Sequence, residues 1–388
     1  MKYIPNRNFL LFCLLSYVII AFISYYFLGV KVVNDTTRYL EYSESLKNGF
    51  YLDPHNKWYL GYVIFIFLNK LLSENLFFIV VAQYFIGLIA VLALYKAIFN
   101  LSKSKIAAFF GTLYFILFLE PITWHSYLLA ESLLASCICI LLYLTSKLIS
   151  KPTKRDYLIM FITLFLTSIT KPTALGIIFS LAIFLIYIIL RKPSYLKVTI
   201  ISCIFLSLLF LVNKSLATYT IFENDYLKGQ IIYGFEIIRN LPYTEWFLID
   251  VPEDIKFPDK DYPKLIQIIL FIIYNPIYWL KLFTLKVFYF LIHARPYWSV
   301  PHIIHSVSFM VVGISSFLYL MLKIQLNTKV KIILSAFFIF QILAVGITTI
   351  DYDGRFIIPL VPIYALSFGL VIKNFTEKKI FALKKKSE

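Results

Sequence analysis

The sequence predicts an all-α polytopic membrane protein with about ten transmembrane helices. Hydrophobic residues make up 60% of the 388 positions, aromatic residues make up 19%, and the mean hydropathy is +0.81. A soluble chain of this length could not bury so much apolar surface. Apolar runs close to the roughly 20 residues that a helix needs to cross a bilayer recur from one end of the chain to the other.

We expect ten of these runs to cross the membrane as helices. They are interrupted by short polar segments, and charged residues are scarce inside them. The expected spans are residues 9–30, 76–99, 106–120, 127–149, 156–170, 173–190, 196–216, 302–322, 331–350 and 355–373. We interpret 9–30 as a retained first span, because it is about twice the length of a signal-peptide core and lacks a small-residue cleavage site.

The distribution of basic residues predicts the orientation. With the N-terminus inside, every predicted cytoplasmic segment is basic, including 103–105, 151–155, 191–197 and the lysine-rich tail from Lys373. The predicted outer loops at 121–126 and 351–354 contain no lysine or arginine. Because cytoplasmic loops are enriched in both residues, we expect the N- and C-termini to be cytoplasmic.

Two further apolar segments are expected to lie on the outer surface. Residues 59–72 are too short to span the hydrocarbon core. Residues 276–294 contain two lysines, and a crossing there would place the basic tail outside. We therefore expect one transmembrane domain over 1–388, with an outer loop and surface helix at 31–75 and a large outer segment at 217–300.

The net charge of +16 does not indicate nucleic-acid binding. The basic residues lie mainly in short loops and the tail, where they orient helices and meet anionic lipid headgroups. The four cysteines all lie within apolar runs and therefore indicate neither a disulfide framework nor a metal site. Membrane lipids are the expected partners, and no nucleic acid is expected.

A polar cluster directly after the first span is the strongest candidate site. Asn34-Asp35-Thr36-Thr37-Arg38-Tyr39 follows an almost wholly apolar stretch. A carboxylate at a membrane–water boundary can serve as a general base toward a substrate carried by a lipid. The alternative is that Asp35 is the N-cap of a helix beginning near Thr36, and the alternative for Arg38 is an ion pair with Asp35.

The order of motifs resembles the integral-membrane GT-C glycosyltransferases that use polyprenyl-phosphate sugars, of the protein mannosyltransferase and aminoarabinose transferase type. The similarity covers the whole chain in order. It rests on Asn34-Asp35-x-x-Arg38-Tyr39-Leu40, Gly49-Phe50-Tyr51, Trp58-Tyr59-Leu60-Gly61-Tyr62, Leu129-Ala130-Glu131-Ser132-Leu133, and the segment from Arg355 to Pro362. The chain differs from the family in having Asn34-Asp35 in place of two acids, and in lacking a proline pair before the surface helix.

The resemblance implies an inverting transfer of a sugar from a polyprenyl-phosphate donor to a glycan, lipid or protein acceptor on the outer face. Nucleotide sugars are absent from that face, so an activated sugar must arrive on a lipid. Asp35 would take the acceptor proton. Cations would stabilise the leaving phosphate, and Arg355 is the first candidate because of its fork geometry. Its alternative is an ion pair with Asp351 or Asp353.

Several other side chains are predicted to contact substrate, each with a structural alternative. Glu131 would contact sugar or acceptor, or form a hydrogen bond in helix packing. Lys171 and Arg295 would contact phosphate, or extend to headgroups. Asp351 and Asp353 are spaced to hold a divalent cation, and the alternative is a solvated turn. His125 with Glu120 or Asp35 would bind a metal, and the alternative is that His125 is a hydrogen-bonded group at the interface. Arg38, Tyr39, His55 and Lys57 complete the candidates, with a solvated loop as the alternative for His55.

Two rival functions remain open on the sequence alone. A polymerase or ligase of lipid-linked glycans would place its essential residues in 217–300, with Arg239 and Arg295 favoured, and would not need Asp35. A lipid or solute transporter (flippase) would place charged residues or broken helices at mid-membrane. Here the ionisable groups lie near the outer ends of the predicted spans.

Overall fold

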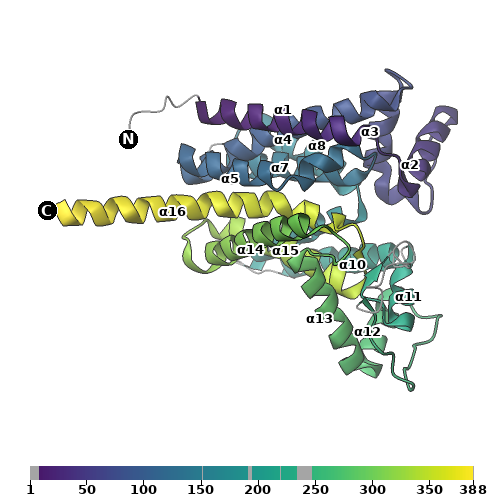
Figure 1. The fold of residues 1–388 in the computed structure, drawn as a ribbon. Helices are drawn as coiled ribbons and strands as arrows, with labels where there is room; N and C mark the ends of the chain where they lie inside the picture. Colours follow the sequence, from purple (N-terminus) through teal and green to yellow (C-terminus); the bar gives the residue numbers. More distant parts are fainter. Residues whose placement is uncertain (1–7, 151, 191–194, 219, 234–246, 388) are drawn as a thin grey trace. The chain divides into compact units, whose positions relative to one another are not determined.

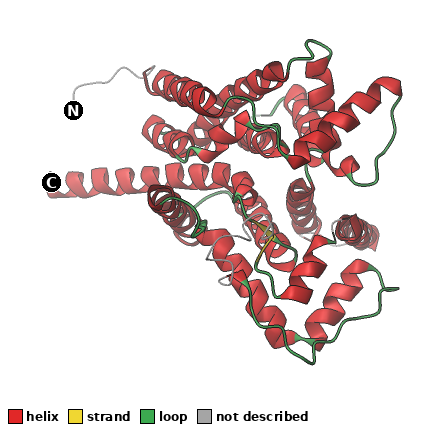
Figure 2. Ribbon diagram, turned by 45° about the vertical axis from the view of Figure 1, so that its right-hand side comes forward, coloured by secondary structure: helices red, strands yellow, loops and turns green. Residues whose placement is uncertain are grey.

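The structure, a computed structural model, is almost entirely helical. It describes residues 8–150, 152–190, 195–218, 220–233 and 247–387 (Figure 1). About 80% of the chain is helical. Within the described ranges the regular strands are β1 (Ile232–Tyr233) and β2 (Ile350–Asp351), which pair in parallel with Ile232 opposite Ile350 (Figure 2). The predicted all-α class is therefore confirmed.

Each of the ten predicted spans coincides with a helix. Helix boundaries are set in several places by side-chain caps: Asn75 Oδ1 accepts from Phe77 N–H, and Ser104 Oγ from Ala107 N–H. The helices are α1 (Asn8–Leu28), α4 (Leu76–Ser102), α5 (Lys105–Leu117), α7 (Ala130–Ser150), α8 (Lys154–Ser168), α9 (Leu175–Leu190), α10 (Tyr195–Thr218), α14 (Val300–Lys323), α15 (Thr328–Ile347) and α16 (Val361–Ser387).

Eight helices in the described part of the chain are long and apolar enough to cross a membrane. The number rises to ten if each of two bent helix pairs is one span. One pair is α5 with the segment Glu120–Ser126, bent by 60°, and the other is α12 (Lys264–Tyr274) with α13 (Pro276–Ile292), bent by 111°. At 15 residues, α8 falls outside this set. The chain is a multi-pass membrane protein by these criteria.

The two segments expected on the surface form short helices. α3 (Leu60–Lys70) has 11 residues, too few to cross about 30 Å of hydrocarbon. The helix expected at 276–294 is α13, and it forms the second arm of the bent α12–α13 pair. Pro276, which lacks an N–H and takes the N1 position of α13, marks the break between the two arms. The positions of α3, α12 and α13 relative to a bilayer stay a prediction.

The chain divides into two compact units. Unit 1 comprises 1–174, 311–326 and 358–388, and unit 2 comprises 175–310 and 327–357. In unit 1, α4 packs against α5 and α7, and α5 packs against α16 (Figure 1). A Cβ on Gly111 would lie 2.7 Å from the Ala365 carbonyl oxygen, and one on Gly369 would lie 2.7 Å from that of Ala107. Small residues four apart on each helix thus allow the α5 and α16 backbones to approach closely.

Unit 2 contains a buried ion pair that sequence analysis did not predict. Lys286 on α13 lies 2.8 Å from Asp225 on α11 (Ile221–Lys228), and both side chains are 0% exposed. The Lys286 ammonium also donates to the Thr348 carbonyl at 2.5 Å. The Tyr226 hydroxyl donates to the Ile347 carbonyl. These contacts join α11 and α13 to the segment between α15 and β2.

Gly61, in the motif that opens α3, is required by a close backbone approach. Its N–H donates to the Ile169 carbonyl at 2.7 Å. A Cβ at this position would lie 2.9 Å from the Leu166 carbonyl oxygen and 3.0 Å from Thr170 Oγ1. The contact fixes the start of α3 against the end of α8, immediately before Lys171.

We expect Gly61→Ala to destabilise unit 1 by about 1–3 kcal/mol, because backbone atoms of α8 cannot rotate away from the added methyl group. Thermal unfolding in detergent measures the effect. Leu68→Ala is the control on the same helix, since the Leu68 side chain is 54% exposed. An unchanged unfolding temperature for Gly61→Ala would contradict the close approach.

Candidate active site

Asp35 lies in the first turn of α2 (Asn34–Ser45) and is not the helix cap. The N-cap position is Val33, whose N–H donates to Thr36 Oγ1 at 3.1 Å. The alternative that Asp35 is the N-cap is therefore wrong, because α2 begins at Asn34 and Asp35 is its second residue. The carboxylate is instead directed at a neighbouring guanidinium, and its side chain is 31% exposed.

Arg38 joins Asp35 to the following loop. Its Nη2 lies 2.9 Å from Asp35 Oδ1, and its Nη1 is hydrogen-bonded to His55 Nε2. The guanidinium carbon lies 5.4 Å from the centre of the Tyr39 ring and 5.8 Å from that of Tyr59. Two aromatic faces and two polar partners thus hold the guanidinium in place. Its side chain is 31% exposed, so a ligand can still reach it.

His55 is held as a neutral hydrogen-bond partner of Arg38. Asp53 Oδ1 accepts from the His55 N–H at 2.9 Å and fixes the start of η2 (Asn56–Tyr59). Partial burial and the adjacent Arg38 guanidinium lower the pKa of His55 below its ordinary value of 6.5. Neutral imidazole offers a lone pair to Arg38, whereas imidazolium would repel it.

We expect the stability of this loop to fall on acidification. The pKa of His55 is lower in the folded protein than its ordinary value of 6.5. Above pH 6.5 the imidazole is neutral in both the folded and the unfolded chain. As the pH falls below 6.5 the unfolded chain binds the proton first, and the free energy of unfolding decreases. Hydrogen exchange over residues 49–59 at pH 7.5 and 5.5 measures it. His55→Gln, which keeps an acceptor for Arg38 but does not titrate, should remove the difference. Equal pH dependence in both proteins would contradict this assignment.

The start of α2 is fixed to the segment that leads into α7. Thr36 Oγ1 donates to the Leu128 carbonyl at 3.0 Å. The Lys31 N–H donates to Ser126 O at 2.9 Å, and the Leu128 N–H donates to Lys31 O at 3.0 Å. The residue after the first span and the residues before α7 therefore form one short parallel bridge. This bridge brings Asp35 toward the helix end that contains Glu131.

Tyr39 lies near enough to both Asp35 and Glu131 to be affected by their charges. It is 1% exposed, and burial is the main cause that raises the pKa of its phenol. The neighbouring phenol of Tyr59 and the negative charges of Asp35 and Glu131 raise this pKa further, while Arg38 lowers it. Interaction with both carboxylates shows that the structure gathers Asp35, Arg38, Tyr39 and Glu131 in one region. The phenol is a neutral hydrogen-bonding group at pH 7.

Glu131 and Lys171 form a buried ion pair. Lys171 Nζ lies 2.5 Å from Glu131 Oε1, and the two side chains are 4% and 3% exposed. Glu131 is the second residue of α7, at the start of the fourth predicted span. The expectation that Lys171 extends to headgroups is wrong, because its ammonium faces a carboxylate inside unit 1. The pair holds the starts of α7 and η4 (Pro172–Ala174) together.

His125 is buried rather than interfacial. It is 2% exposed, and its ring centre lies 5.3 Å from that of Tyr84 and 6.3 Å from that of Tyr17. Its position is fixed by Gln83, which sequence analysis missed: Gln83 Nε2 donates to the carbonyls of His125 and Tyr127. The sequence signal that could have pointed to Gln83 was a polar amide side chain inside the apolar run 76–99.

Lys57 lies in η2, two residues beyond His55, and its side chain is partly exposed.

In unit 2, Arg295 is a buried structural residue. Its Nη1 donates to the carbonyls of Tyr289 at 2.9 Å and Ala294 at 3.0 Å, and its Nη2 donates to the Asp351 carbonyl at 3.0 Å. The side chain is 1% exposed. The expected headgroup contact is therefore wrong, because these N–H groups donate to backbone carbonyls inside the protein. Through these hydrogen bonds Arg295 connects the end of α13 to β2. The expected phosphate contact conflicts with this burial.

Arg355 lies beside the two acids that precede it. Its Nε is 3.5 Å from Asp353 Oδ1 and 3.8 Å from Asp351 Oδ2, and its side chain is 16% exposed. Burial, and then the neighbouring Asp351 carboxyl, raise the pKa of Asp353 well above its ordinary value. The distances to the two carboxylates favour the ion-pair alternative for Arg355, and its contact with a donor phosphate stays a prediction. Arg355 lies in η6 (Arg355–Leu360), one short helix before α16.

Among the residues that the structure describes, no group of three or more His, Cys, Asp or Glu side chains is arranged to hold a metal ion. The divalent cation suggested for Asp351 and Asp353 stays a prediction. Arg239, the residue favoured by the polymerase hypothesis, lies outside the described residues.

Comparisons with models of protein families, with curated proteins and with solved structures find no significant match.

Proposed function

We propose that this chain is an integral-membrane glycosyltransferase of the GT-C type. It transfers a sugar from a polyprenyl-phosphate donor to an acceptor hydroxyl at the outer face of the plasma (inner) membrane, with both termini in the cytoplasm. The observation that supports this most is the Asp35–Arg38–His55 cluster. It is a partly exposed carboxylate with a fixed cation, placed in the first turn after the first span.

In the proposed reaction the acceptor hydroxyl attacks the anomeric carbon from the side opposite the phosphate. Asp35 accepts the hydroxyl proton as the new carbon–oxygen bond forms. The bond from the anomeric carbon to the phosphate oxygen breaks, and its electron pair leaves with polyprenyl phosphate. A single displacement of this kind inverts the anomeric configuration.

The other residues of the cluster have supporting roles in this proposal. Arg38 orients the Asp35 carboxylate and presents its exposed N–H groups to an anionic donor. His55 and the rings of Tyr39 and Tyr59 hold the guanidinium in that orientation. Glu131 and Lys171 act on this region from its buried side as positioning residues, since each is engaged by the other.

The proposal is tested by the identity of the lipid product. Purified protein in liposomes is offered polyprenyl-monophosphate sugars and, separately, a polyprenyl-diphosphate glycan, together with fractions of cell-envelope acceptors. Mass spectrometry of the lipids should show free polyprenyl monophosphate. Release of polyprenyl diphosphate would instead support the polymerase or ligase. Movement of an unchanged lipid between leaflets would support the transporter.

A further inference from the structure

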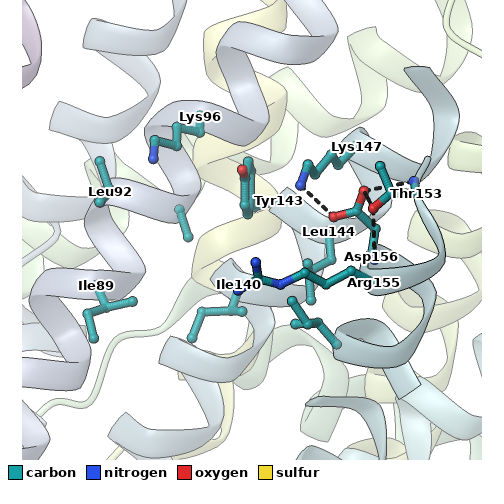
Figure 3. A pocket seen from close by; sticks show the side chains of 12 residues that line it. Ile89, Leu92, Lys96, Ile140, Tyr143, Leu144, Lys147, Thr153, Arg155 and Asp156 are labelled. Carbon is teal, nitrogen blue, oxygen red and sulfur yellow. Dashed lines mark hydrogen bonds and ion pairs between the residues drawn. The ribbon is translucent and has the colours of Figure 1, made fainter. Parts of the chain in front are cut away.

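A pocket of about 540 Å³ opens between α4, α7 and α8 in unit 1 (Figure 3). It lies where α4 and α7 end and α8 begins, the end that the positive-inside rule predicts to be cytoplasmic. One wall is aliphatic and contains Ile89, Leu92, Ile140, Leu144 and Ile159. The volume is in the range of about 300–1,000 Å³ that is usual for small-molecule sites.

The polar side of the pocket has an excess of positive charge. Lys96, Lys147 and Arg155 line it, and Asp156 is the single acid among its lining residues. Lys147 donates to Asp156 Oδ1, while Asp156 Oδ2 accepts from the Thr153 N–H and hydroxyl at 2.9 and 2.8 Å. The Asp156 carboxylate is thus neutralised by Lys147 and caps the start of α8. The positive charges of Lys96 and Arg155 can therefore neutralise a bound anion.

The depth of Lys96 is the second observation. It lies six residues before Ser102, the last residue of α4, or about 9 Å from that helix end at 1.5 Å per residue. It also lies three residues before the end of the predicted span 76–99, where an ammonium is costly unless it extends to the headgroups or meets an anion. Its nitrogen lies 5.8 Å from the centre of the Tyr143 ring, and Figure 3 shows it facing the same space as Arg155.

We propose that this pocket binds an anionic glycerophospholipid, with the phosphate between Lys96 and Arg155 and an acyl chain along the aliphatic wall. The aliphatic wall reaches the outer surface of α4, where Ile89 is 41% exposed, so a chain can enter from the bilayer. A water-soluble anion would use the cations but leave this wall uncovered. Basic pockets between helices on the cytoplasmic side are typical sites for anionic headgroups. This inference does not depend on the proposed function.

The test is native mass spectrometry of the full-length protein released from detergent with equimolar phosphatidylglycerol and phosphatidylcholine. We expect the wild type to retain one phosphatidylglycerol in preference to phosphatidylcholine. Lys96→Gln combined with Arg155→Gln should reduce the retained phosphatidylglycerol at least tenfold. Lys105→Gln, a basic residue at the start of α5 outside the pocket lining, is the matched control and should bind as the wild type does.

Two further arms keep the result unambiguous. Leu92→Trp fills the aliphatic side without changing charge, and it should also reduce retention. Soluble glycerol phosphate at millimolar concentration should not bind. Equal retention of both lipids, or wild-type retention by the double variant and by Leu92→Trp, would overturn the site. Binding of glycerol phosphate as tight as that of the lipid would assign the pocket to a soluble anion instead.

Discussion

Asp35→Asn is expected to reduce the rate of sugar transfer by about 10²–10⁴-fold, the usual contribution of a positioned general base. Asparagine keeps the shape of the side chain and an oxygen that can accept from Arg38, but it cannot take the acceptor proton. The loss should therefore appear in kcat, with little change in KM, because substrate binding does not require proton transfer. Initial rates at saturating donor measure the effect, with membrane abundance determined alongside.

Two variants make this result specific. Glu41→Gln removes an exposed carboxylate from the same helix, and it should leave the rate unchanged. Asp35→Glu keeps the base one methylene further out, and it should retain more activity than Asp35→Asn. Wild-type activity in Asp35→Asn would exclude Asp35 as the base.

Breaking the Glu131–Lys171 pair is expected to give a large loss of stability in unit 1. Glu131→Gln and Lys171→Met each leave one uncompensated charge in a site that is 3–4% exposed. Removing one partner of a buried ion pair typically costs about 3–5 kcal/mol. The double variant, which leaves no net charge there, should recover most of the loss. Thermal unfolding of the three variants in detergent completes a double-mutant cycle.

The surface ion pair between Glu44 and the partly buried Lys70 is the control for this cycle. Glu44 is 50% exposed, so Glu44→Gln should change the unfolding temperature little. If Glu131→Gln instead loses activity while its unfolding temperature is that of the wild type, Glu131 contacts substrate and the structural role is wrong. Full additivity of the two single variants would also contradict a direct pair.

The helices were predictable from the sequence, because each comes from a long local apolar run. The ten expected spans all coincide with helices, and nine of them agree with the observed boundaries to within three residues. The exception is the last span, expected at 355–373, where α16 begins at Val361 after η6 and continues to Ser387. The bends were not predictable in the same way. The 111° turn before Pro276 depends on how α12 and α13 pack within unit 2, and the residues of α12 had been assigned only to an outer segment.

The candidate site was predictable only where its residues are near in sequence. The Asp35–Arg38 pair spans three positions on one helix and was among the expected alternatives. Glu131 and Lys171 are 40 residues apart, and nothing in either local sequence indicates the other. Arg295 was misjudged for the same reason, since the Asp351 carbonyl that it contacts lies 56 residues away. Long-range pairing decides whether such a charge faces substrate or the protein.

The anomeric configuration of the product shows whether the sugar is transferred in a single displacement. With a donor of known configuration, proton NMR of the newly glycosylated acceptor distinguishes the two stereochemical outcomes by the coupling of the anomeric proton. A single displacement with Asp35 as the base predicts that the product has the configuration opposite to that of the donor. A product with the same configuration as the donor would contradict the proposed mechanism.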